Sequence, residues 1–141
     1  AFPLVKTRVT AQGRLEARSF SERVDTFSRG LQALRAHPLL GAGMGNGTLA
    51  IARAFPGLPV WQYQPPHNAA FVAVVEVGLL GFLALVSVLT SLLRGVWVRP
   101  LARTLIATLA FVGVFDHYLW TLPAGLGLLG FGIVLATLKR H

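Results

Sequence analysis

The stretch Gln64–Gly81, QPPHNAAFVAVVEVGLLG, decides how the chain is organised. Pro66 has a fixed φ and no N–H, so it suits the approach to a helix and not the interior of one. A long apolar run follows, broken only by Glu76 and two glycines. His67 and Asn68 are therefore predicted to lie at the mouth of a membrane helix. Such a pair is either an ordinary interfacial feature or part of a site.

The composition is that of a membrane protein. Of the 141 residues, 54% are hydrophobic and 13% are charged, and the mean hydropathy is +0.62, which is too apolar for an ordinary soluble domain. The net charge of +8 points to phosphate-bearing lipid rather than nucleic acid, because the arginines share a chain with membrane spans. The absence of cysteine excludes disulfides and thiolate metal sites. We expect the C-terminal piece of a larger membrane protein.

Three apolar segments are predicted to cross the membrane, over residues 68–93, 104–120 and 123–138. The first is long enough to span with some tilt. The second reaches Asp116 after only roughly 18 Å of helix, which is short for a ~30 Å core, so we expect it to continue past Asp116 and His117. The fold class is then an all-α integral membrane protein.

The basic clusters at 94–103 and 139–141 indicate the orientation. The positive-inside rule places both on the cytoplasmic side. Residues 1–67 then form an outward-facing loop, and His67 and Asp116 share the outer side of a multi-pass membrane protein. The outer segment is itself rich in arginine, against the rule, which indicates that these arginines serve anionic ligands.

An amphipathic helix is predicted over residues 19–37 of the outer segment. Ser19 and Glu22 form a capping-box pattern. An apolar stripe recurs at helical spacing, and Pro38 disfavours the α region before it. Arg23 lies at the border of this stripe, whereas Arg29 has the position of a solvated or headgroup-facing residue.

The following segment, PLLGAGMGNGTL over residues 38–49, is rich in glycine. Such a loop presents N–H groups to phosphate, or it is simply a tight turn. It matches neither a phosphate-binding P-loop nor a dinucleotide fingerprint, since no Gly-Lys-Ser/Thr follows and no strand precedes it. Residues 50–66 continue as a loop that contains Arg53 and an interfacial aromatic, Trp61.

Short motifs occur along the chain in a fixed order. His67 and Asn68, nine residues, Gly78, two residues and Gly81 make the pattern H-N-x9-G-x-x-G. Glu76 stands at the acidic position of E-x-G-L-x-G.

Further motifs lie upstream, S-x-R at 21–23 and P-L-x-G-x-G-x-G-N at 38–46. Together the blocks resemble the O-antigen ligase and polymerase superfamily of polyprenyl-diphosphate-dependent glycosyltransferases, over nearly the whole chain. One departure is Phe27, where that superfamily often carries Trp.

The resemblance implies a metal-independent membrane glycosyltransferase without a cofactor, the C-terminal part of a GT-C-like bundle. It would move a glycan from a polyprenyl diphosphate, such as undecaprenyl diphosphate, to an acceptor hydroxyl at the outer face. A leaving diphosphate needs cations, and the bidentate fork of Arg suits it; the motif match assigns this role to Arg23. The acceptor hydroxyl needs a base, and His suits that role; the motif match assigns it to His67.

Asp116 is the third catalytic candidate, as a base, a base-orienter or the partner of an arginine. Glu76 is alternatively the partner of a buried arginine, and His117 an interfacial neighbour. The candidate substrate-binding residues are Asn68, Glu76, Arg29, Arg53 and His117.

Several functions stay open at this point. The acceptor is lipid A core for a ligase, another repeat unit for an O-antigen or exopolysaccharide polymerase, or a protein hydroxyl for an O-oligosaccharyltransferase. A function of another class is a non-enzymatic lipid-binding or transporter module. A transporter is expected to show discontinuous spans and a site at the membrane midplane.

Overall fold

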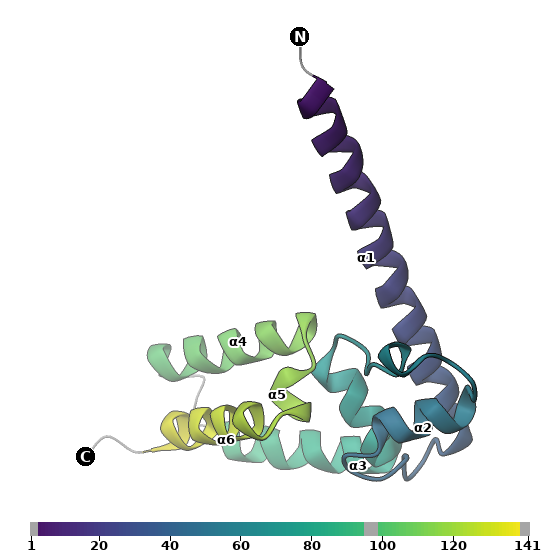
Figure 1. Ribbon diagram of the computed structural model, residues 1–141. Helices are drawn as coiled ribbons and strands as arrows, with labels where there is room; N and C mark the ends of the chain where they lie inside the picture. The colour runs from purple at the N-terminus through teal and green to yellow at the C-terminus, as the bar shows by residue number, and fades with distance from the viewer. Residues whose placement is uncertain (1–2, 95–98, 139–141) are drawn as a thin grey trace.

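The computed structural model describes residues 3–94 and 99–138, with side chains from residue 14 onward. This part of the chain is helical and contains no strand, which confirms the all-α expectation. The elements are α1 (Pro3–Ala36), α2 (Gly47–Ala54), the 3-10 turn η1 (Val60–Gln62), α3 (Ala69–Leu93), α4 (Pro100–Phe115), α5 (Tyr118–Thr121) and α6 (Pro123–Thr137). In Figure 1, α1 rises away from α3, α4 and α6, which lie alongside one another.

Helix α1 is longer than predicted. It begins at Pro3 rather than at Ser19, so the capping-box prediction is wrong: Ser19 lies inside the helix, and Glu22 pairs with Arg18 at 2.8 Å. Residues 4–18 contain no proline, and a helix propagates readily once its first turn has formed. The predicted end is confirmed, since α1 stops at Ala36 before Pro38. The sequence also predicts that residues 1–5 are the tail of a preceding span. Residues 3–5 belong to α1, and residues 1–2 lie outside the described part.

The glycine-rich loop docks on a break in α3. At Gly78 the backbone leaves the helical region, with φ 69° and ψ 179°. The loop bonds to both sides of this break through Ala42 N to Val75 O, Gly43 N to Glu76 O, Leu79 N to Pro38 O and Leu80 N to Leu39 O, at 2.8–3.1 Å. The backbones of Gly41 and Gly78 are in contact, and a Cβ on either residue would overlap the backbone of the other segment. The discontinuity expected of a transporter is therefore present, but the loop occupies it.

Helix α1 packs on the start of α3 through its C-terminal half. Phe27 stacks on Phe71 with ring centroids 4.7 Å apart. At Gly30 a Cβ would lie 2.8 Å from Pro66, so the glycine permits this close approach. Below this contact, Ala33 joins a small buried core with residues of α2 and α3. The stretch before His67 is thus held against α1.

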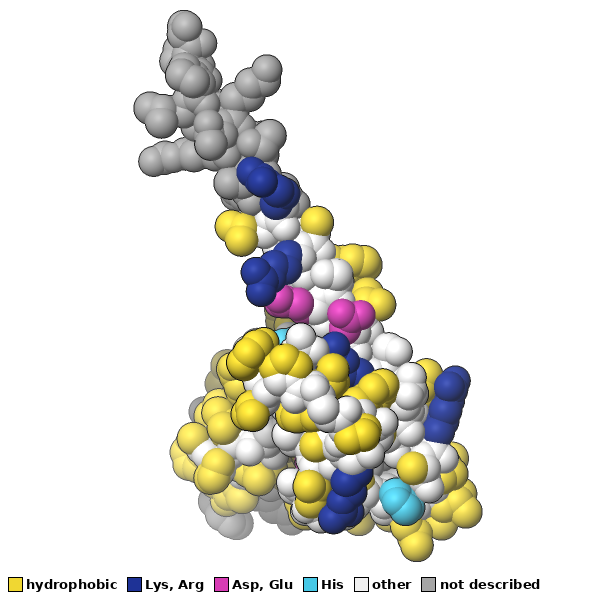
Figure 2. Space-filling view, turned by 45° about the vertical axis from the view of Figure 1, so that its right-hand side comes forward, with side chains coloured by type: hydrophobic (Ala, Val, Ile, Leu, Met, Phe, Trp, Pro, Cys, Tyr) yellow, Lys and Arg dark blue, Asp and Glu magenta, His cyan; other side chains and the backbone are white. Residues whose placement is uncertain are grey.

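Only α3 is long and apolar enough to cross a membrane, judged on length and composition within the described residues. Helices α4 and α6 have 16 and 15 residues, or about 24 and 22 Å, less than a ~30 Å core needs. Three spans therefore stay a prediction. Apolar side chains are exposed along the second half of α3, α4 and α6; Figure 2 shows apolar side chains over the body, with charged ones along the described part of α1.

The second predicted span ends earlier than expected. Helix α4 stops at Phe115, and Asp116 is extended, with φ −147° and ψ 155°. The carboxylate of Asp116 accepts a hydrogen bond from His117 N at 2.7 Å, and this local bond competes with helix continuation. A separate short helix, α5, leads to α6, whose first residue is Pro123.

The basic turn lies beside the end of α6. Arg99 donates from Nη1 to Leu138 O at 2.7 Å and contacts Ala136 O at 3.4 Å, so it satisfies carbonyls at this helix end. Arg99 of the basic turn therefore lies at the same end of the helices as Leu138, the last described residue. Residues 95–98 and 139–141 are outside the described part, and the side of the membrane that this end faces stays a prediction.

Candidate functional site

His67 stands between a buried proline and a helix cap. Pro66 is fully buried, and Asn68 is the N-cap of α3, with Oδ1 accepting from Phe71 N at 2.8 Å. The predicted helix start is thus confirmed. The other end of the Asn68 amide donates from Nδ2 to Val114 O at 3.1 Å, near the end of α4. These contacts are internal to the protein and leave His67 at the mouth of α3.

The structure brings His67, Asp116 and His117 together. Asp116 Oδ1 lies 4.0 Å from His67 Nδ1 and 4.0 Å from His117 Nε2, and the two imidazole rings are 5.4 Å apart. The side chains of His67 and Asp116 are about one third exposed, at 31% and 35%. The carboxylate therefore lies beside two neighbouring imidazoles at the edge of solvent.

His117 is the buried member of this cluster, at 8% exposure. Burial lowers the pKa of His117, against the opposing attraction of Asp116, and nearby His67 lowers it further. Its Nδ1 lies 2.8 Å from the Thr121 hydroxyl. These effects favour a neutral imidazole that acts as a fixed neighbour of Asp116.

The same cluster has the residue types of a metal centre. Its three candidate ligand atoms lie within 4.8 Å of one another. Ligands of a tetrahedral Zn²⁺ stand roughly 3.3 Å apart given metal–nitrogen distances near 2.0 Å, so the side chains would have to close in. The expectation of no metal stays a prediction, which treatment of the full-length protein with a chelator tests.

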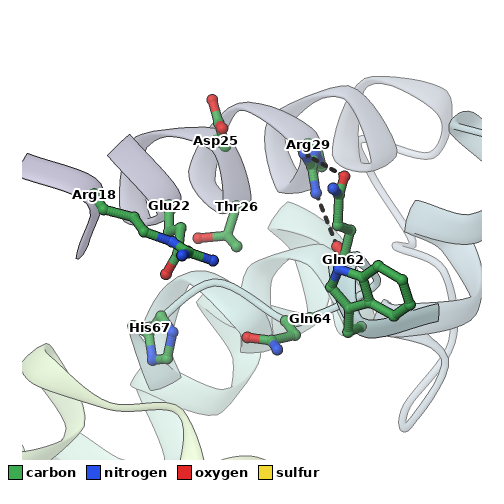
Figure 3. A pocket seen from close by; sticks show the side chains of 9 residues that line it. Arg18, Glu22, Asp25, Thr26, Arg29, Gln62, Gln64 and His67 are labelled. Atoms are coloured by element: carbon green, nitrogen blue, oxygen red, sulfur yellow. Dashed lines mark hydrogen bonds and ion pairs between the residues drawn. The ribbon is translucent and has the colours of Figure 1, made fainter. Parts of the chain in front are cut away.

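A polar cleft of about 300 Å³ opens above His67, between α1 and the segment that precedes α3. Figure 3 shows Arg18, Glu22 and Thr26 extending from α1 toward His67, while Asp25 points away. Its lining is Arg18, Glu22, Asp25, Thr26, Arg29, Trp61, Gln62, Gln64 and His67.

Two arginines of α1 border this cleft. Arg29 donates to Gln62 through Nη1 to the backbone O at 2.8 Å and Nη2 to Oε1 at 3.3 Å. Arg18 is held by Glu22 at 2.8 Å. Arg18 and Arg29 share a face because residues eleven apart differ by only about 20° around a helix. Sequence reasoning missed Arg18, although this spacing was a signal for it.

Arg23 and Arg53 lie elsewhere. Arg23 is exposed on α1 and is absent from the cleft lining. Arg53 is exposed on α2 and borders a different cleft of about 190 Å³, together with His37 and Asn46. Of the three arginines proposed from the sequence, Arg29 alone lines the same cleft as His67.

Glu76 is buried, at 5% exposure. It accepts from Gly45 N at 3.0 Å, from Gly47 N at 3.2 Å and from Trp120 Nε1 at 2.8 Å. Its partners are thus loop N–H groups and an indole rather than a buried arginine. The glycine-rich loop does present N–H groups to an anion, and that anion is a carboxylate of the protein.

An apolar cavity of about 570 Å³ lies between α3, α4 and α6. It reaches from Leu93 to Val114 and Trp120 and is lined almost wholly by hydrocarbon. The end of the cavity at Val114 and Trp120 therefore lies next to the turn between α4 and α5 that holds Asp116.

The sequence matches the family model described as O-antigen ligase over residues 1–86, more than half of the chain. The chain belongs to the O-antigen ligase family. In this O-antigen ligase homologue the matched region includes α1, the glycine-rich loop, His67 and the break at Gly78, whereas Asp116 and His117 lie beyond it. No curated protein and no solved structure matches the chain.

Family membership confirms the resemblance seen in the motifs and indicates O-antigen ligase or polymerase-type activity on glycan and lipid-linked substrates. The family is membrane-associated, in agreement with the span-length helix α3.

Proposed function

We propose that the protein transfers a glycan from a polyprenyl-diphosphate-linked donor to an acceptor hydroxyl at the outer face of the inner membrane. The observation that carries this proposal is the position of His67. One side of its imidazole faces the carboxylate of Asp116 at 4.0 Å, and it also lines the cleft bordered by Arg18 and Arg29. The imidazole proposed as the base thus lies beside the proposed orienting acid and shares a cleft with the proposed cationic groups.

His67 is the proposed general base. The acceptor hydroxyl gives its proton to the imidazole, and the acceptor oxygen forms a bond to the anomeric carbon of the donor. The bond between that carbon and the diphosphate oxygen breaks, and the diphosphate leaves with the electron pair. Asp116 stabilises the imidazolium that forms, a role that a carboxylate near histidine commonly has.

The leaving diphosphate is the proposed ligand of the arginines. Arg29 donates two hydrogen bonds to Gln62, and its guanidinium has further N–H donors at a residue that lines the cleft. Arg18 adds a second guanidinium. Arg23 stays a proposed diphosphate contact on its motif position, and Arg53 a more distant candidate substrate contact. The apolar cavity beside Trp120 supports a donor with a hydrocarbon chain.

The same chemistry requires only that the acceptor offers a hydroxyl. Lipid A core, a further repeat unit and a protein side chain all offer a hydroxyl to His67. Loss of the gene therefore removes a modified lipid A core, a long glycan chain or a glycoprotein, and analysis of the glycans in a deletion strain distinguishes the three.

The decisive experiment is glycan transfer by His67→Gln in the full-length protein. Glutamine retains hydrogen-bonding groups but cannot take up a proton near neutral pH. We expect transfer to fall by about 100-fold or more, with donor binding retained. Transfer close to wild type, at equal protein level, would remove His67 as the base. A wild-type protein that binds the donor without transferring it would instead favour a lipid-binding module.

A further inference from the structure

Two hydrogen bonds connect the start of α3 to residues 114–120, which carry Asp116 and form the corner between α4 and α6. On one side of the corner, Asn68 Nδ2 donates to Val114 O at 3.1 Å. On the other side, Trp120 Nε1 donates to Glu76 Oε2 at 2.8 Å. Asn68 and Glu76 both belong to the segment that begins with His67. The corner is therefore held on both sides of Asp116 by the element that positions His67.

The Glu76–Trp120 bond reaches Asp116 through the backbone of α5. Trp120 N donates to His117 O at 2.9 Å, and His117 N donates to Asp116 Oδ1 at 2.7 Å. The direction of the carboxylate thus depends on where α5 lies. A helix of four residues does not hold itself in place, because isolated helices this short are unstable in water.

Glu76 is itself a firm anchor. It is buried, and its carboxylate oxygens accept from Gly45 N and Gly47 N in addition to Trp120. A buried carboxylate with three donors is held in one position. A Cβ on Gly47 would lie 3.0 Å from Oε1 of Glu76, so the loop fits closely around it.

The geometry points to Glu76, Trp120 and Asn68 as positioning residues that keep the Asp116 carboxylate in reach of His67. This inference rests on the proposed function, because it assigns Asp116 a role at His67. It replaces the direct substrate contact expected for Asn68 and Glu76. The separation of 4.0 Å is already longer than a hydrogen bond, so a small shift of α5 changes whether the two groups interact.

The test is Trp120→Phe in the full-length protein, reconstituted in lipid with a polyprenyl-diphosphate-linked oligosaccharide. Phenylalanine keeps an apolar ring in place but lacks the N–H. We expect kcat to fall about tenfold, the effect of a small displacement in a catalytic group, with KM for the donor unchanged. Asn68→Ser is the second variant, since serine still caps α3 but does not reach Val114.

The same substitution is then made in an Asp116→Asn background. If Trp120 acts through Asp116, Trp120→Phe causes no further loss of kcat there. Equal fractional losses in both backgrounds would overturn the inference and leave a general structural role. Glu16→Gln, an exposed change on α1, is the control and should transfer at the wild-type rate.

The possible failures are distinguishable. If wild type and Glu16→Gln do not transfer glycan, the proposed function fails. If they transfer and both Trp120→Phe and Asn68→Ser match wild type in kcat, the positioning role fails. Should Trp120→Phe not fold, as judged by thermal melting, Asn68→Ser in the two backgrounds decides the question.

Discussion

The imidazole of His67 and the carboxylate of Asp116 face each other with Nδ1 and Oδ1 4.0 Å apart. His67 precedes α3, and Asp116 follows α4. The pair therefore exists only because the start of α3 lies beside the end of α4. Its consequence is an imidazole beside a carboxylate at the edge of a polar cleft, the pair proposed above as base and orienting acid.

Removal of the Asp116 charge should weaken transfer without removing substrate binding. Asp116→Asn keeps the size of the side chain but no longer stabilises an imidazolium at His67. We expect kcat to fall by about 10²-fold and KM for the donor to change little, as measured by steady-state transfer. An Asn variant with wild-type kcat would show that His67 works without this carboxylate.

Arginine-to-lysine substitutions should show which arginines contact the donor. Lysine keeps the charge but loses the guanidinium fork. Arg29 borders the cleft, so Arg29→Lys should raise KM for the donor about tenfold. This corresponds to a loss of roughly 1.4 kcal/mol of binding free energy. Arg23→Lys should also reduce activity sharply if the motif assignment is right. The matched control is Arg35→Lys, an exposed change at the end of α1, for which we expect wild-type transfer.

The proposed diphosphate contact of Arg23 can be contradicted separately. Full activity of Arg23→Lys and Arg23→Ala, at normal expression, would transfer its proposed role to Arg29 and Arg18. That result would agree with the exposed position of Arg23 on α1.

Alanine at Gly78 should destabilise the protein. Its φ of 69° lies in the left-handed region, and a Cβ would overlap the backbone N of Gly41, so strain of about 1–3 kcal/mol adds to a clash with the docked loop. A lower melting temperature in detergent, with loss of transfer, is the expected result. Gly127→Ala is the control, because its Cβ meets nothing within 4 Å and alanine favours a helix. Equal melting of the two variants would mean that the break in α3 is dispensable.

Topology is tested by cysteine labelling in a cysteine-free background of the full-length protein; the 141 residues themselves contain no cysteine to replace. We expect an impermeant thiol reagent, applied from outside, to label a cysteine at Gln62 and not at Gly95. The reason is the cluster of arginines at 94–103. Labelling at 95 alone would reverse the proposed orientation and move His67 to the cytoplasmic side.

Some of the site could be predicted because local rules act on it. Proline at 66 and asparagine at 68 define a helix start through φ restriction and capping, and Pro38 defines the end of α1. The sequence predicts that His67 and Asp116 converge, because His67 opens one predicted span and Asp116 lies near the outer end of the next. The structure differs in one respect, since α4 ends before Asp116 rather than after it. That error arose because the side chain of Asp116 bonds to the next N–H, a local competition that hydropathy does not register.

The amino-acid sequence by itself determined the helical class, the mouth of α3 and the family motifs, because periodicity, proline and glycine act over a few residues. Only the tertiary structure decided which side chains meet. The rotation of α1 against Phe71 brings Arg29 and Arg18, and not Arg23, to the cleft. The docking of the loop on Gly78 places Gly45 and Gly47 at Glu76. Such contacts depend on how distant elements pack against one another. Helical spacing shows that Arg18 and Arg29 share a face, but it does not show what that face packs against.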